Sequence, residues 1–245
     1  MNTLKHIVLI GVGLIGGSFV LDLKRLGLVD TVTGIDLDRD NLDRALERRV
    51  IDRAYTQIDA LSMHEADLAV IATPVSTFPD ICRTVRPYLN AHTVVTDVGS
   101  TKQSAVQAFR SVLPEHLSRC IAAHPIAGSD RNGALSAQFG LFQDRKLVIT
   151  PHGEEDEQAV SLVENLWLAV GAQTFRMSAE EHDAVFAAVS HMPHLAAFAY
   201  VHQIADHPDG RRYLEFAATG FRDFTRIASS RSEEHTSELQ SPLII

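Results

Sequence analysis

Two polar side chains, Ser100 and His124, follow apolar strand patterns at positions where a proton could be moved. Ser100 closes the segment Asp97-Val98-Gly99-Ser100, and His124 is followed by Pro125. In parallel sheets ligands bind beyond the carboxyl ends of the strands, so both side chains are expected to converge on one substrate atom. A neutral imidazole is a suitable base near pH 7. A histidine at a strand end is by default more often structural, but the abrupt turn His-Pro-Ile-Ala-Gly-Ser favours a catalytic ring held just outside the sheet.

A glycine-rich turn near the N-terminus has the spacing of a dinucleotide site. Gly11-Val12-Gly13-Leu14-Ile15-Gly16 follows the apolar run HIVLI and precedes a helical pattern. The first glycine permits a tight turn, the second lets the backbone approach a pyrophosphate, and the third packs helix against strand. Free N–H groups at the start of the helix then face the phosphates. In this strand–turn–helix context the pattern predicts a bound dinucleotide, with a ligand-free glycine turn as the alternative.

Asp36 ends the second predicted strand, twenty residues after Gly16. At that position a carboxylate can accept hydrogen bonds from ribose hydroxyls, and it would repel the 2′-phosphate of NADP. We therefore expect NAD as the cofactor, although Arg39 lies close enough in the sequence to weaken the preference. Thr73 and Pro74 end another predicted strand, and we assign them to the same cofactor site.

Strands and helices must alternate regularly to hold these residues at one edge, and the first 178 residues show that pattern. The predicted strands are HIVLIG, VTGID, DLAVIAT, TVVTDVG, RCIAAHP, KLVITP and AQTFRM, and the predicted helices lie near 14–27, 38–48, 76–88, 101–112 and 155–170. Several strands are apolar throughout, which is typical of strands covered on both faces. The alternation predicts an α/β fold with a Rossmann-type, doubly wound and mostly parallel sheet.

The strand signals stop at Ala179. Residues 179–205 form one long helical pattern that is rich in alanine, which suggests close packing between helices. We therefore predict a first domain over residues 1–178 and the start of an all-α domain over residues 179–230.

Composition narrows the classes of protein. The net charge of −9 disfavours nucleic acid as a partner but does not exclude an anionic substrate. No apolar run has the length of a membrane span, and the two cysteines are too few for a disulfide framework, so we expect a cytoplasmic protein. The acidic run at 154–157 could suggest a metal site, but acidic residues are common in the first turn of a helix, and we expect no metal.

Five motifs in order, GVGLIGGS, DVGSTK, HPIAGSD, SHMPH and DFTRIA, resemble the motif series of the prephenate dehydrogenase family. The resemblance covers residues 5–230. It implies a Rossmann-type domain followed by a helical dimerisation domain, a homodimer, and a substrate bound between the two domains. It also implies NAD-dependent oxidative decarboxylation of prephenate to 4-hydroxyphenylpyruvate in tyrosine biosynthesis. Arogenate, which differs from prephenate only in a keto or amino group, is the alternative substrate.

The resemblance also implies roles for individual residues. His124 matches the catalytic histidine that bonds the C4 hydroxyl of the substrate, and Ser100 matches the serine that orients both groups. Arg226 matches the arginine that holds a substrate carboxylate. His194 matches a substrate-binding position, and Ser190 and His191 line the same region.

The other histidines can be interpreted without a catalytic role. His191 and His194 lie three residues apart on one helical face, as a pair of metal ligands could. Pro193 lies between them and the sequence offers no third ligand, so a metal site at these histidines is disfavoured. We interpret His182, His202 and His207 as ordinary surface or boundary residues.

Residues 231–245 break the helical pattern and add no motif. Residues 231–241 resemble the translation of a sequencing-library adapter, so we expect a non-native tail, a C-terminally truncated chain, and no catalytic competence in the chain as printed. Two rival functions remain open. One is another two-domain NAD(P) reductase, which would typically carry a lysine where this chain has histidines. The other is a dinucleotide-binding regulatory protein without turnover, which would leave Ser100, His124, His194 and Arg226 without a reason.

Overall fold

The computed structural model describes residues 3–127 and 133–229, and it divides into two compact units. The division falls between His182 and Asp183. Residues 128–132, which carry the Gly-Ser-Asp end of the HPIAGSD motif, and the expected foreign tail at 231–245 lie outside the described residues.

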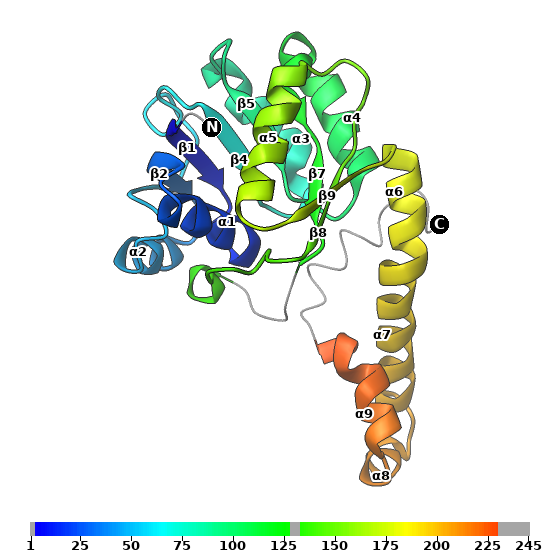
Figure 1. Ribbon diagram of the computed structural model, residues 1–245. Helices are drawn as coiled ribbons and strands as arrows, with labels where there is room; N and C mark the ends of the chain where they lie inside the picture. The colour runs from blue at the N-terminus through cyan, green and yellow to red at the C-terminus, as the bar shows by residue number, and fades with distance from the viewer. Residues whose placement is uncertain (1–2, 128–132, 230–245) are drawn as a thin grey trace. The chain divides into compact units, whose positions relative to one another are not determined.

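The first unit is built on a six-stranded parallel sheet in the order β3-β2-β1-β4-β5-β6 (Figure 1). The strands are β1 Leu4–Ile10, β2 Val29–Ile35, β3 Arg53–Tyr55, β4 Leu68–Ile71, β5 Val94–Asp97 and β6 Cys120–Ile121. The order reverses beside β1, because β2 lies on one side of it and β4 on the other. A reversal of this kind is where doubly wound sheets bind ligands. The predicted Rossmann-type α/β fold is therefore confirmed.

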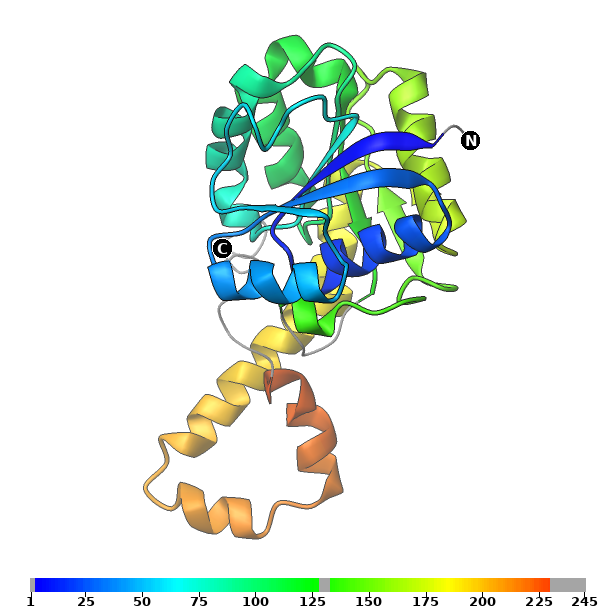
Figure 2. The same ribbon diagram turned by 90° about the vertical axis from the view of Figure 1, so that its left-hand side faces the viewer.

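Helices cover both faces of this sheet (Figure 2). The α-helices in the described part of the chain are α1 Leu14–Arg25, α2 Arg39–Glu47, α3 Phe78–Val85, α4 Lys102–Val112, α5 Glu157–Ala169, α6 Ala179–Phe186, α7 Met192–Ala205, α8 Gly210–Glu215 and α9 Thr219–Thr225. Short 3-10 helices lie at Val75–Thr77, Arg86–Tyr88, Pro114–Arg119, Ala134–Ser136 and Arg226–Ser229. Side chains of β1 alternate between two cores, since Ile7 and Leu9 join α1 and α5 on one face while Val8 and Ile10 join α3 and α4 on the other.

The core beside α1 and α5 contains a buried aromatic pair, and the core beside α3 and α4 contains two buried thiols. Trp167 of α5 is fully buried and stacks on Phe19 of α1, with ring centroids 4.1 Å apart. The opposite core contains the thiols of Cys82 and Cys120, which are also fully buried. Burial raises the pKa of Cys82 to about 12 and raises that of Cys120 as well.

The later strands differ from the prediction. The run RCIAAHP is not one strand but two, because it breaks at Ala122 into β6 and β7 Ala123–Pro125. Strand β7 pairs antiparallel with β8 Lys146–Ile149, and β8 pairs parallel with β9 Gln173–Arg176, in a separate three-stranded sheet. Strand β3 was not predicted, since its three residues are partly exposed and form no apolar run.

A buried ion pair explains the break. The ammonium of Lys102 binds the carboxylate of Asp97, and both side chains are fully buried. The N–H of Ala123 donates to Asp97 Oδ1 at 3.1 Å, and the carbonyl of Ala123 accepts from Lys102 Nζ at 2.7 Å. Because these two backbone groups are taken by side chains, they are not free to continue the first sheet. The chain leaves that sheet at the residue before His124.

The second unit is helical. Residues 179–205, of which 179–182 still belong to the first unit, form 27 consecutive helical positions. They are long and apolar enough by composition to cross a membrane, yet only 11% of the most apolar stretch is buried. Apolar side chains exposed on it are Val185, Val189, Met192 and Tyr200. Within the unit, Tyr200 packs against Phe221 and Phe224 of α9, with ring centroids 5.7 and 5.8 Å apart.

The buried pair leads to a stability prediction. Lys102→Met keeps the length of the side chain but leaves the Asp97 carboxylate buried without its cation. We expect the free energy of unfolding to fall by about 3–5 kcal/mol, the range for breaking a buried pair. Urea unfolding followed by fluorescence measures this, because Trp167 is the only tryptophan and lies in the first unit. Arg86→Met, which breaks the exposed Arg86–Glu115 pair, is the control, expected to cost no more than about 1 kcal/mol. Equal losses in the two variants would contradict the role given to Lys102.

Candidate cofactor and catalytic site

Each of the three glycines in the N-terminal turn meets a different steric requirement. Gly11 has a φ of +89°, and a Cβ on it would lie 2.6 Å from the carbonyl oxygen of Ala72. A Cβ on Gly16 would lie 2.5 Å from Leu9 Cδ1, so α1 could not pack as closely on β1. A Cβ on Gly13 would meet no protein atom within 4 Å. The first and third glycines therefore shape the turn, and the second leaves its backbone open to approach.

Helix α1 starts directly from this turn with Leu14 and Ile15. Its N-cap residue is Gly13, which has no side chain to bond the first N–H groups, and no acidic residue stands in the first turn. Helix starts of this kind are favourable sites for anions such as phosphates. The local structure thus fits the pyrophosphate of a dinucleotide.

The carboxylate of Asp36 is held beside the glycine turn. It accepts hydrogen bonds from the Val12 N–H at 3.0 Å, the Asp38 N–H at 3.0 Å and Asn41 Nδ2 at 3.1 Å. Asp36 is half-buried and directly follows β2. Arg39, the residue that could have favoured NADP, donates instead to Asp43 at 3.1 Å on the surface of α2.

Asn41 is a residue that the sequence analysis missed. Its buried amide donates to Asp36 and to the carbonyl of Val12 at 2.8 Å, and it accepts from the N–H of Ala134 at 2.8 Å. It therefore fixes the carboxylate, the glycine turn and the loop after residue 133 together. The only signal in the sequence was a polar residue on the apolar face of the helix near 38–48.

Thr73 and Pro74 follow β4 beside the same turn. A Cβ on Gly11 would meet the Thr73 methyl at 3.0 Å, so Thr73 lies against the first glycine. The hydroxyl of Thr73 hydrogen-bonds that of Thr77 at 2.8 Å, and the Thr77 hydroxyl donates to the Pro74 carbonyl at 2.7 Å. The structure thus brings together the predicted cofactor residues Gly11, Gly13, Leu14, Ile15, Gly16, Asp36, Thr73 and Pro74.

The Asp97–Lys102 pair connects the two predicted catalytic residues. Asp97 accepts from the N–H of Gly99 at 2.8 Å, next to Ser100, and from the N–H of Ala123, next to His124. The backbone beside both residues is thereby bound to one carboxylate, after the end of β5 and at the first residue of β7, so His124 lies within β7 and not beyond its end. Burial raises the pKa of Asp97, while attraction by Lys102 and the two N–H groups opposes the rise.

His124 has an unexpected neighbour. Its Nδ1 lies 2.8 Å from Nε2 of His182, and the ring centroids are 5.1 Å apart at an interplanar angle of 63°. His182 lies in α6 and is fully buried, whereas His124 is half-buried. The interpretation of His182 as an ordinary surface or boundary residue was therefore wrong. No local sequence pattern joins residues so far apart in the chain.

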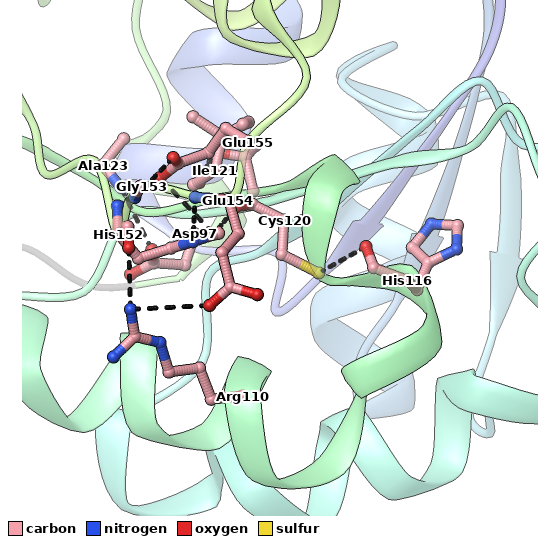
Figure 3. Close-up of polar contacts among 11 residues, drawn as sticks. Asp97, Arg110, His116, Cys120, Ile121, Ala123, His152, Gly153, Glu154 and Glu155 are labelled. Carbon is pink, nitrogen blue, oxygen red and sulfur yellow. Dashed lines mark hydrogen bonds and ion pairs between the residues drawn. The ribbon is translucent and has the colours of Figure 1, made fainter.

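The acidic run at 154–157 has structural partners. Glu155 accepts from the backbone N–H groups of His152 and Gly153, and Arg110 of α4 reaches the His152 carbonyl and Glu154 (Figure 3). Asp156 caps α5 by accepting from Gln158 N at 2.8 Å. Across residues 3–127 and 133–229, no group of three or more His, Cys, Asp and Glu could hold a metal ion.

Four predicted substrate residues lie in the helical unit. Residues Ala187–His191 form a π-helical turn, in which the N–H of Met192 bonds the carbonyl of Ala187. Pro193 follows and has no N–H to continue the α-helical pattern, which accounts for the irregular turn. His194 Nδ1 lies 2.9 Å from the Ser190 carbonyl, so Ser190, His191 and His194 share one turn.

Arg226 lies elsewhere in the same unit. It is exposed and begins the short helix Arg226–Ser229, which packs against α7. The helix of His194 and the helix of Arg226 are therefore neighbours within this unit.

Comparison with known proteins agrees with both units. The family model described as prephenate dehydrogenase, nucleotide-binding domain, matches residues 19–176, and the one described as its dimerization domain matches residues 178–237. The prephenate dehydrogenase of Bacillus subtilis is 39% identical over 235 residues, which is 94% of this chain. The chain spans 62% of the length of that relative. The cyclohexadienyl dehydrogenase of Zymomonas mobilis is 32% identical over 232 residues, 94% of this chain and 78% of the relative.

Solved structures agree as well. The prephenate dehydrogenase of Aquifex aeolicus, crystallised with hydroxyphenyl propionate and NAD+, aligns with a TM-score of 0.90 at 31% identity, covering 97% of this chain and 82% of that one. The arogenate dehydrogenase of Synechocystis aligns with a TM-score of 0.78 at 26% identity, covering 96% and 83%. A nucleotide-binding domain and a dimerisation domain in this order place the chain in one family: it belongs to the prephenate dehydrogenase family.

Proposed function

We propose that the protein is an NAD-dependent oxidoreductase that decarboxylates prephenate oxidatively to 4-hydroxyphenylpyruvate, in the cytoplasm and as a step of tyrosine biosynthesis. The observation that carries this proposal is that Asp97 binds the backbone N–H groups of Gly99 and Ala123, the residues next to Ser100 and His124, in a unit that also holds a dinucleotide fingerprint. A regulatory protein would need the fingerprint but not this pair of side chains beside one buried carboxylate.

The residues of the first unit fit NAD. The open backbone at Gly13 and the uncapped start of α1 would hold the pyrophosphate, and Asp36 would accept hydrogen bonds from ribose hydroxyls. When bound, NAD would supply the acceptor for the hydride that leaves C4 of the substrate.

His124 takes the proton in this proposal. As C4 is oxidised, its hydroxyl becomes a carbonyl and must lose a proton, which Nε2 of a neutral His124 can accept. Ser100 would orient the hydroxyl and the ring. Loss of carbon dioxide then restores an aromatic ring, so the protein has mainly to position the groups.

The helical unit would hold the anionic ends of the substrate. The guanidinium of Arg226 suits a carboxylate because it can donate two parallel hydrogen bonds, and His194, with Ser190 and His191 on its turn, would line the same region. The apolar side chains exposed on α6 and α7 suit the second subunit of a homodimer. Arogenate is the second candidate substrate, since an arogenate dehydrogenase and a cyclohexadienyl dehydrogenase are among the relatives. NADH formation with each compound decides between them.

Asp36 should determine the choice of cofactor. Its carboxylate would repel a 2′-phosphate, so we expect kcat/KM to be higher with NAD than with NADP in the complete gene product. Asp36→Ser should narrow the gap between the two kcat/KM values, while Asp30→Ser, at the exposed start of β2, should leave it unchanged. Equal kcat/KM values for the two cofactors in the unmodified enzyme would disprove this role.

His124 should be needed for turnover and not for cofactor binding. We expect His124→Asn to lower kcat by about two to four orders of magnitude, the range for losing a general base. Affinity for NAD, measured by fluorescence titration, should change little, and the exposed control His92→Asn should keep kcat. A near-normal kcat at neutral pH in His124→Asn would remove His124 from this role.

Cofactor binding and turnover should separate in the 245-residue chain. The cofactor residues all lie in the first unit, so we expect this chain to bind NAD. We expect it to form no NADH from prephenate, because the apolar side chains that would pack against a second subunit on α6 and α7 lie exposed. Calorimetric titration with NAD and an NADH assay with prephenate test this. Turnover by the 245-residue chain would refute it.

A further inference from the structure

The contact between His124 and His182 assigns a role to a residue outside the proposed reacting groups. We propose that His182 is a positioning residue, which holds His124 in the tautomer that can accept the substrate proton. The proposal rests on the proposed function of His124 as a base. Its basis is the 2.8 Å approach of His124 Nδ1 to His182 Nε2, together with the complete burial of His182.

Only one proton can lie between the two nitrogens, so the pair has two neutral arrangements. In the first, His124 donates Nδ1–H to His182, and its Nε2 carries no proton and can therefore accept one. In the second, His182 donates Nε2–H to His124, whose own proton then sits on Nε2 and blocks it as a base. Catalysis by His124 Nε2 requires the first arrangement.

The first arrangement is also the one that survives proton transfer. Once protonated, His124 carries a proton on each ring nitrogen, so Nδ1 can only donate. A neutral His182 provides the acceptor without any change of partners. A third group that fixes the tautomer of a catalytic histidine has the same logic in hydrolase triads.

The surrounding structure holds His182 in place within the first unit. Its backbone N–H bonds the Ser178 carbonyl at 2.9 Å, and the Ser178 hydroxyl accepts from the Glu181 N–H at 3.1 Å. Ala179, in the same turn of α6, is buried in the core that α3 and α4 share. The backbone of His182 is therefore held by hydrogen bonds and burial at the start of α6.

Two substitutions separate positioning from simple packing. His182→Leu fills similar space but cannot accept a hydrogen bond, while His182→Gln places an amide oxygen near the position of Nε2. In the complete gene product we expect His182→Leu to lower kcat about ten- to hundredfold, the range for losing a hydrogen bond to a charged group. KM for prephenate and affinity for NAD should change less than about twofold, because His182 acts through His124. His182→Gln should recover most of kcat, and His92→Leu should leave kcat unchanged.

Nitrogen-15 NMR of the histidine rings gives a readout that does not depend on turnover. In the unmodified protein, His124 should carry its neutral-form proton on Nδ1, and in His182→Leu the Nε2–H tautomer should appear. A proton on Nε2 of His124 in the unmodified protein would overturn the inference, as would an unchanged kcat in a folded His182→Leu. If His182→Leu does not fold, His182→Gln and the shorter His182→Asn replace it, and equal kcat in both would also overturn it. Absence of turnover by the unmodified enzyme would instead refute the proposed function, and the NMR result would still stand.

Discussion

The buried ion pair of Asp97 and Lys102 is the interaction on which the site depends. Two charges without water are costly unless every lone pair and proton finds a partner. Here the additional partners are backbone groups, the N–H of Gly99 and both polar groups of Ala123. Satisfying the pair therefore ends the first sheet after β6, starts β7, and places the residues beside Gly99 and Ala123 at one edge. The same contacts stabilise the fold and define the geometry of the proposed catalysis.

A second buried polar network, centred on Asn41, joins separate segments of the chain at the proposed cofactor site. Asn41 uses both donors and its acceptor on Asp36, the turn at Val12 and the loop at Ala134. Asn41 thus fixes the Asp36 carboxylate, as the Asp97–Lys102 pair fixes the backbone beside Ser100 and His124. In the proposed reaction neither Asn41 nor the ion pair is a reacting group. This arrangement matches the need for reacting groups to be held within small tolerances while they remain partly exposed.

Local patterns in the sequence were sufficient for part of this structure. The five helices and the main strands of the first unit follow from apolar runs and their spacing, and the glycine positions follow from steric demands that act over a few residues. The second sheet could not be predicted, because the break at Ala122 depends on side chains from β5 and α4. Lys102, Asn41 and His182 were missed for the same reason. Each is a polar residue in an otherwise ordinary helical pattern, and its partner lies far away along the chain.

The two buried cysteines can serve as native probes of local unfolding in the first unit. Only a thiolate reacts readily with alkylating reagents, and burial keeps Cys82 and Cys120 protonated and covered in the native state. Modification must therefore wait until the core between the sheet and helices α3 and α4 opens. Under conditions where closing is faster than labelling, the rate of alkylation reports the population of that opened form. The alkylation rate of two native cysteines therefore measures how often the core between the sheet and helices α3 and α4 opens, and no engineered label is needed.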